Sequence, residues 1–136
     1  MKVLFVTSMY PNPSNSSAGL FVQEQVLALR AQGVEVRVAY VDKHVKWPFG
    51  FLKRYRNVWF APATINDPPW VLRLNVTVWP GGVGIVRQAP KWERRLFACI
   101  QGAWPDFCPD VIHAHTFVPG GIIAARLAGR FHRPFV

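Results

Sequence analysis

The chain of 136 residues carries little negative charge: 7 Asp and Glu residues stand against 16 Lys and Arg, which gives a formal net charge of +9. This imbalance favours anionic partners such as a nucleotide, a phospholipid surface or a nucleic acid, and charge alone does not choose among them. Long hydrophobic runs are also missing, since no segment reaches the ~18 consecutive apolar residues of a membrane-spanning helix. The length fits one domain, and the hydrophobic share of 51% argues against a disordered chain.

Cysteines and glycine motifs for nucleotide binding are equally scarce. The two cysteines, Cys99 and Cys108, have a spacing that matches no metal motif and no disulfide framework, so we interpret them as free thiols of a cytosolic protein. Neither G-x-G-x-x-G nor G-x-x-x-x-G-K-S/T occurs. Asp42 ends the predicted second strand, where a ribose-binding acid would stand, but without the glycine motif we expect no nicotinamide cofactor.

What the chain does have is an alternation of strand-like and helix-like segments. Continuous or alternating apolar residues predict strands over 3–7, 34–42, 71–79 and 109–116, and a fifth strand that begins at 134. Apolar residues at helical spacing predict helices over 18–32, 89–103 and 119–131. Strands and helices that alternate with short connections form βαβ units, in which the strands are parallel.

These units predict an α/β fold, a Rossmann-like three-layer αβα sandwich with a parallel sheet. Residues 1–136 are expected to form a single domain of this kind. The strand predicted from Pro134 has only three residues, Pro134 to Val136, whereas an open α/β sheet normally continues. We therefore expect the chain to be a truncated piece of a longer protein, with a second half missing.

Two loops of this fold are candidate ligand sites, because ligands of doubly wound sheets bind at the carboxyl ends of the strands. The loop over 8–19 follows the first strand and ends in Gly19, and the loop over 115–121 follows the fourth strand. Glycine lets a ligand approach the backbone, and free N–H groups at a helix N-terminus favour phosphate. For Gly19, a plain loop-to-helix turn is the alternative.

Two of the four histidines, His113 and His115, stand two positions apart in the predicted fourth strand, so they share one face of it. His113 lies deeper, and we interpret it as a core residue bonded to backbone carbonyls. His115 lies at the ligand edge, where a neutral imidazole can donate to a hydroxyl, a phosphate or a sugar oxygen. A zinc pair would have only Asp110 as a nearby third ligand, on the opposite side of the pleat, so we expect no metal.

The segment over 43–60 combines basic and aromatic residues without any Asp or Glu. Cations beside aromatic rings suit the surface of an anionic membrane, to which each basic residue contributes about 1 kcal/mol. The residues predicted to make this contact are Lys46, Trp47, Lys53, Arg54 and Arg56. An ordinary loop packed on the sheet is an equally good interpretation. We expect no nucleic-acid partner, because no RNA- or DNA-binding motif is visible.

Two long stretches together resemble a known family. The segments "KVLFVTSMYPNPSNSSAGLFVQEQVLALRAQGVEVRVAYV" and "PDVIHAHTFVPGGIIAARLAGRFHRPFV" are similar to the N-terminal half of family 4 glycosyltransferases. These are retaining enzymes of the two-Rossmann-domain type called GT-B. The resemblance spans nearly the whole chain and is weak only over 43–70. It depends on the order and spacing of the segments rather than on one motif.

The resemblance implies roles for particular residues. His115 matches the histidine that faces the transferred sugar and the acceptor, which makes it the candidate catalytic residue, and His113 would be its buried neighbour. The loop with Ser17, Ala18 and Gly19 would lie near the donor diphosphate, although it has fewer glycines than the common form of this loop. Thr116, Gly120 and Gly121 would line the acceptor side. The family's main nucleotide-sugar contacts, including a pair of glutamates, belong to a C-terminal domain absent from this chain.

The implied reaction is metal-independent transfer from a nucleotide-sugar donor to a hydroxyl of a glycan or lipid-linked acceptor, with retention. Helix amides and basic side chains would stabilise the leaving diphosphate. No cofactor is expected, and the half alone should turn over little or nothing. A non-catalytic α/β module that binds a nucleotide or a phospholipid is the alternative. The expected location is the cytoplasm, including the inner face of the membrane.

Overall fold

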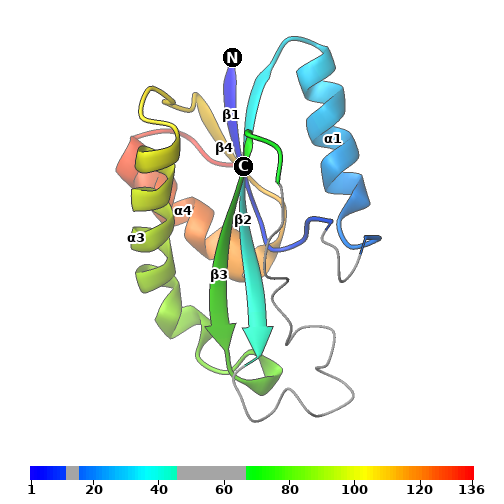
Figure 1. The fold of residues 1–136 in the computed structure, drawn as a ribbon. Coiled ribbons are helices and arrows are strands. Elements are labelled where there is room, and N and C mark those ends of the chain that lie inside the picture. The colour runs from blue at the N-terminus through cyan, green and yellow to red at the C-terminus, as the bar shows by residue number, and fades with distance from the viewer. Residues whose placement is uncertain (12–15, 46–66) are drawn as a thin grey trace.

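The computed structural model describes residues 1–11, 16–45 and 67–136 and contains a sheet of four parallel strands (Figure 1). The strands are β1 (Lys2–Thr7), β2 (Glu35–Val45), β3 (Val71–Val78) and β4 (Val111–Ala114). Their order across the sheet is β3-β2-β1-β4, so β1 lies between β2 and β4.

Helices cover both faces of this sheet. They are α1 (Leu20–Ala31), α3 (Ile85–Ala103) and α4 (Ile122–Phe131), with short helical turns at Pro80–Gly82 and Phe117–Gly121. Helix α1 lies on one face, and α3 and α4 lie together on the other (Figure 1). The predicted three-layer αβα sandwich with a parallel sheet is therefore confirmed. We call the two sides of the sheet the α1 face and the α3/α4 face.

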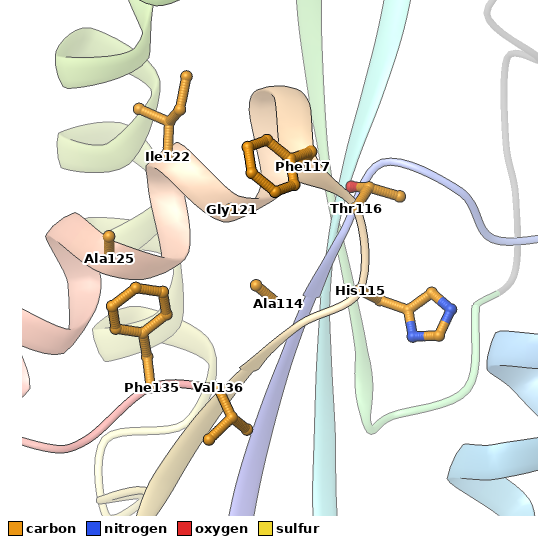
Figure 2. Close-up of a pocket in the computed structure, with 9 residues that line it drawn as sticks. All are labelled: Ala114, His115, Thr116, Phe117, Gly121, Ile122, Ala125, Phe135 and Val136. Atoms are coloured by element: carbon orange, nitrogen blue, oxygen red, sulfur yellow. The ribbon is translucent and has the colours of Figure 1, made fainter.

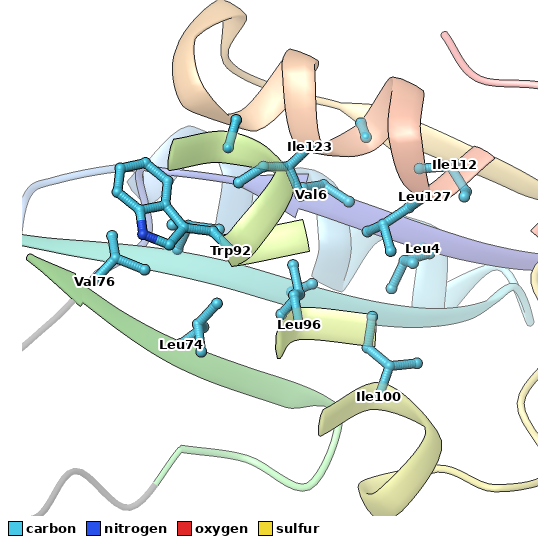
Figure 3. Packing of buried hydrophobic residues seen from close by; sticks show 14 of the residues in the cluster. Leu4, Val6, Leu74, Val76, Trp92, Leu96, Ile100, Ile112, Ile123 and Leu127 are labelled. Atoms are coloured by element: carbon cyan, nitrogen blue, oxygen red, sulfur yellow. The ribbon is translucent and has the colours of Figure 1, made fainter. Parts of the chain in front are cut away.

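The strands bury both of their faces, which explains the long apolar runs in the sequence. In β1, Val3 and Phe5 pack with Val22 and Val26 of α1. The alternate residues Leu4 and Val6 belong to the α3/α4 core. This core is mostly aliphatic, and Figure 3 shows how its side chains interdigitate. Full burial of each large apolar side chain contributes about 1.5–3 kcal/mol, so the interdigitation supplies much of the stability.

A buried ion pair joins the two helices of the α3/α4 face. Glu93 of α3 is only 1% exposed, and Arg130 of α4 donates a hydrogen bond from Nε to its carboxylate. Arg126 approaches the other carboxylate oxygen at 3.9 Å. A buried carboxylate needs such partners, because without them its desolvation would be costly. The pair therefore fixes α4, whose N-terminus borders the candidate site, against α3.

The second strand differs from its prediction. It continues through Val45 rather than ending at Asp42, so Asp42 lies within β2. Its carboxylate accepts hydrogen bonds from the Tyr40 hydroxyl at 3.0 Å and from Arg73 Nη1 at 2.9 Å. The comparison of Asp42 with a ribose-binding acid at a strand end is therefore wrong, because the neighbouring strand already engages this carboxylate.

Other boundaries also differ: β4 ends at Ala114, one residue before His115, and α4 begins at Ile122 rather than at Pro119. Helix α3 begins at Ile85, whereas the sequence predicts a start at Ala89 because the exposed Val86 and Arg87 do not fit the apolar period of the later turns. At the other end of the chain, the predicted fifth strand is represented by a single parallel bridge between Ile112 and Phe135. Backbone hydrogen bonds there join Ile112 N to Pro134 O at 3.0 Å and Ala114 N to Val136 O at 2.7 Å.

Candidate functional site

The loops after β1 and β4 meet at the carboxyl edge of the sheet. Because the two strands are parallel neighbours, their ends lie at the same edge. Ser8 donates a backbone hydrogen bond to Thr116 Oγ1 at 3.2 Å, and the two hydroxyl groups lie 3.0 Å apart. The backbone N–H of His115 donates to the carbonyl of Val6 at 3.1 Å. The structure thus joins the two candidate loops that the sequence predicts at one edge.

Gly19 has the left-handed backbone conformation, with φ of 72°, and it caps the N-terminus of α1. A Cβ atom on it would lie 2.6 Å from the carbonyl carbon of Met9 and 2.8 Å from the backbone nitrogen of Tyr10. Only glycine fits there, because the loop after β1 approaches the start of α1 closely. The close approach at Gly19 is therefore to the chain's own backbone. Ser17 is exposed and Ala18 half-buried just before the helix.

The turn after β4 is also closely packed. A Cβ atom on Gly120 would lie 2.3 Å from Thr116 Oγ1, so Gly120 is buried beneath the threonine. The backbone N–H of Gly121 donates to the carbonyl of Thr116 at 2.6 Å. Of these three residues, Thr116 and Gly121 reach the surface of the site and Gly120 supports them from below.

His115 and His113 point to the α1 face, as their spacing predicts. Their ring centroids are 5.7 Å apart, and the ring of Phe5 lies 4.5 Å from that of His113. On its other side, the His115 ring contacts Phe21 in the first turn of α1, with 4.9 Å between centroids. His115 is therefore held between the fourth strand and the helix that follows the first loop.

Burial lowers the pKa values of both histidines. For His115, desolvation is the cause. For His113, desolvation is the main cause, and a positive charge on His115 lowers the pKa further. An imidazole with a lowered pKa is neutral at pH 7, so His115 can exchange hydrogen bonds with a substrate without adding charge to the site.

A pocket of about 450 Å³ lies on the other side of β4 from the imidazole. It is lined by Ala114, His115, Thr116, Phe117, Gly121, Ile122, Ala125, Phe135 and Val136. Figure 2 shows the His115 ring pointing away from Ala125, Phe135 and Val136. The pocket is thus mostly apolar, with the Thr116 hydroxyl as its polar side-chain group, and His115 stands at the boundary between this pocket and the α1 face.

Comparison with known proteins identifies the family. The family described as "Glycosyl transferase 4-like domain" matches residues 18–136, which include all of the site described above except the β1 strand and its loop up to Ser17. The chain belongs to this glycosyltransferase family. The predicted resemblance to family 4 glycosyltransferases is therefore confirmed.

One curated relative of this glycosyltransferase domain comes from Bacillus subtilis (strain 168). It is named "Putative teichuronic acid biosynthesis glycosyltransferase TuaC" and is 28% identical over 142 aligned residues. The alignment covers 100% of this chain and 35% of the relative, so the chain spans about a third of the relative's length. No solved structure gives a significant match to the chain.

Two residues of the candidate site, Phe21 and Ser8, were not singled out from the sequence. Phe21 falls outside the apolar stripe of Val22, Val26 and Leu29. An aromatic residue outside such a stripe, in the first turn of a helix, is the sequence feature that could have indicated its place at the site. Ser8 gave no signal, because its pairing with Thr116 depends on the register of β1 and β4.

Other predictions concern residues that were not assigned to this site. The five residues assigned to membrane contact, Lys46, Trp47, Lys53, Arg54 and Arg56, lie outside the described residues. Within the described ranges, none of the helices combines the length and the apolar character needed to cross a bilayer. In the same ranges, no three His, Cys, Asp or Glu side chains are grouped so that they could hold a metal ion. Cys99 and Cys108 are exposed and unpaired.

Proposed function

We propose that this glycosyltransferase domain forms the acceptor-side half of a cleft in which a sugar passes from a nucleotide-sugar donor to a hydroxyl of a glycan or lipid-linked acceptor. The observation that supports it best is the contact of His115 with the first turn of α1, at 4.9 Å between the rings of His115 and Phe21. It places a hydrogen-bonding imidazole beside a helix N-terminus at the ligand edge of the sheet. A second Rossmann-like half would supply the remaining donor contacts.

The start of α1 suits the donor's diphosphate. The first turn of α1 has no acidic residue, and no side chain of the residues that the structure describes caps it. The N-terminal end of a helix carries a partial positive charge, so it stabilises an anion placed there. Negative charge grows on the diphosphate as the bond to the sugar breaks, which makes this stabilisation larger in the transition state than before it. Ser17 and Ala18 would line the same approach.

His115 would bind the sugar that is transferred. Its lowered pKa keeps the ring uncharged at neutral pH, so it can exchange a hydrogen bond with a sugar hydroxyl. We expect the acceptor hydroxyl to attack the anomeric carbon from the side on which the diphosphate leaves, which retains the anomeric configuration. The proton of that hydroxyl would pass to the leaving phosphate oxygen, so the step needs neither a metal ion nor a cofactor.

The pocket next to Thr116 would receive the acceptor. Its lining is mostly apolar, which fits an acceptor with an apolar portion beside the reacting hydroxyl. A lipid-linked glycan has that character. The teichuronic acid in the name of the Bacillus relative favours a glycan acceptor for this chain as well.

The decisive experiment measures release of nucleoside diphosphate from a panel of nucleotide sugars, with lipid-linked glycans as acceptors. The whole protein that contains this domain should release diphosphate with at least one donor, and the 136-residue chain alone should release little. His115→Asn should lower turnover per folded molecule. The matched control is His132→Asn, at the exposed end of α4, where φ of 51° suits asparagine. Equal turnover of the two variants would contradict the role of His115.

A further inference from the structure

Phe21 is an exposed aromatic residue at the edge of the proposed site. It lies in the first turn of α1, and 48% of its surface is exposed, although the neighbouring Val22 is fully buried. The exposed part does not reflect a loose position, because one side of the ring packs on the imidazole of His115 at an angle of 47°. Phe21 therefore contacts the candidate catalytic residue directly and also faces solvent.

The backbone of Phe21 is fixed from both directions along the chain. Before it, Gly19 is pressed against the backbone of Met9 and Tyr10, where no other residue would fit. After it, Val22 and Val26 anchor α1 in the core of the α1 face. The position of the Phe21 ring over His115 therefore follows from the packing of the helix.

His115 is also held from the strand side. Its backbone N–H bonds to Val6 on β1, and its ring lies 5.7 Å from His113, the titratable side chain in ring contact with it. His113 is itself packed on Phe5. The His115 imidazole thus contacts the ring of His113 on β4 and the ring of Phe21 on α1. Of these two rings, that of Phe21 lies at the surface.

The two nitrogens of the His115 ring have different surroundings. Nδ1 is buried and has no hydrogen-bond partner among the described residues. Nε2 is not among the buried side-chain atoms of these residues that lack a partner. In folded proteins, a buried N–H without an acceptor is rarer than a buried acceptor without a donor. The proton of the uncharged ring therefore belongs on Nε2, which makes Nε2 a donor and leaves the lone pair on Nδ1.

We propose that Phe21 is a positioning residue that keeps Nδ1 of His115 covered and its Nε2–H directed to the substrate. Phe21 acts through the imidazole by shielding one side of it from water and by limiting its rotation. The consequence is that His115 donates a hydrogen bond to an oxygen of the sugar or phosphate and does not accept the proton of the acceptor hydroxyl. This assignment of the donor role builds on the proposed function, whereas the contact of Phe21 with the ring does not.

The test is nitrogen NMR of the histidine side chains in the chain labelled with ¹⁵N-histidine. Long-range ¹H–¹⁵N spectra distinguish the Nε2–H form from the Nδ1–H form, and the His115 signals are assigned by their loss in His115→Asn. We expect the Nε2–H form at neutral pH and a titration midpoint below the ordinary histidine value of 6.5. A dominant Nδ1–H form would overturn the proposal.

Three variants separate positioning from general stability. Phe21→Ala should raise the titration midpoint of His115 towards 6.5 and mix the two proton positions, because water then reaches the ring. Phe21→Tyr should keep the original spectrum, because it retains the ring. Leu27→Ala is the matched control, since Leu27 is 49% exposed on the same helix but lies beyond its first turn. Unchanged His115 signals in Phe21→Ala would overturn the proposal.

Activity of the whole protein gives an independent measurement. Phe21→Ala should lower kcat roughly tenfold, with a smaller change in KM, because displacement of a group at the reacting centre affects the transition state more than binding. Leu27→Ala should keep kcat. If the protein transfers no sugar while the NMR results hold, the proposed function fails and the positioning role of Phe21 stands. If sugar transfer depends on His115 but the His115 signals do not change in Phe21→Ala, the positioning role fails and the proposed function stands.

Discussion

The two faces of the sheet differ in the chemistry that they bury. The core of the α3/α4 face is mostly aliphatic and includes Leu4, Leu96 and Ile112. The α1 face carries polar and aromatic groups on the same strands, including Asp42 and His113. Since consecutive strand residues alternate between the faces, one set of strands serves both purposes. The difference indicates that the α1 face supplies the polar and aromatic groups of the candidate site, whereas the α3/α4 face supplies a mostly aliphatic core and the apolar pocket beside Thr116.

Polar groups on the α1 face are kept by specific partners. Arg73 lies between Asp67 and Asp42, with Nε 2.8 Å from Asp67 and Nη1 2.9 Å from Asp42. Its guanidinium also lies 4.6 Å from the centre of the Tyr40 ring. Such a satisfied network tolerates burial, whereas the Nδ1 atom of His115 has no hydrogen-bond partner within residues 1–11, 16–45 and 67–136. The contrast separates the part of this face that supports the sheet from the part that borders the site.

The largest expected effect tests the aliphatic face. Leu96→Ala should lower the free energy of unfolding by about 3–4 kcal/mol, because Leu96 is fully buried and its removal leaves a cavity between α3 and the sheet. The matched control is Leu27→Ala on α1, where the leucine is 49% exposed and the loss should be below about 0.5 kcal/mol. Urea unfolding of both variants measures the difference, and similar losses would contradict the assignment of the core.

The next effect tests the close packing at the start of α1. Gly19→Ala should lower the free energy of unfolding by about 2–3 kcal/mol, because it combines left-handed backbone strain with a clash against Met9. Gly33→Ala isolates the strain, since Gly33 has φ of 81° and nothing within 4 Å of the added atom. We expect about 1 kcal/mol for this control. Equal losses in the two variants would show that the contact with Met9 has no energetic weight.

A smaller effect tests the ion pair on the α3/α4 face. Arg130→Ala should lower the free energy of unfolding by about 1–2 kcal/mol, because it removes the hydrogen-bonded partner of the buried Glu93. The expected loss of stability is modest because water partly solvates the Arg130 side chain. Arg126→Ala is the control, since Arg126 lies 3.9 Å from the carboxylate and is half exposed. In thermal unfolding, Arg130→Ala should have a lower midpoint temperature than Arg126→Ala. The opposite order would contradict the role of the pair of Glu93 and Arg130.

The smallest effect concerns pH and belongs to the α1 face. The folded pKa values of His113 and His115 are lowered from 6.5, so the unfolded chain binds more protons just below that pH than the folded chain does. The free energy of unfolding should therefore fall as the pH decreases through 6.5 towards the lowered pKa values. Replacement of both histidines by glutamine should flatten this part of the pH profile. A profile as steep as that of the original chain would show that other groups cause the loss.

Much of the fold could be predicted from the residue pattern. The run from Val3 to Thr7 and the alternation from Val71 to Val78 predicted β1 and β3 because strand period and burial leave a direct mark on the sequence. Asp42 was misplaced for the opposite reason. A charged residue within a buried strand is unusual, and the pattern does not reveal that Arg73 on the next strand pairs with it.

The candidate site was predictable only in part. The spacing of His113 and His115 fixed their common face, since alternate residues of a strand point the same way. The ring that covers His115 was not predictable, because Phe21 belongs to another element and its distance from the strand depends on how α1 packs. The close contacts at Gly19 and Gly120 were equally invisible, since a glycine in the sequence does not show what lies beside its missing Cβ.

The sequence by itself determined the alternation of strands and helices, the burial of both faces of the sheet and the edge at which the two loops end, because periodicity and turn residues act locally. Only the tertiary structure decided that Phe21 covers His115, that Ser8 meets Thr116 and that Arg73 neutralises Asp42. Those pairings join residues that are distant along the chain, and their geometry is set by strand register and helix packing.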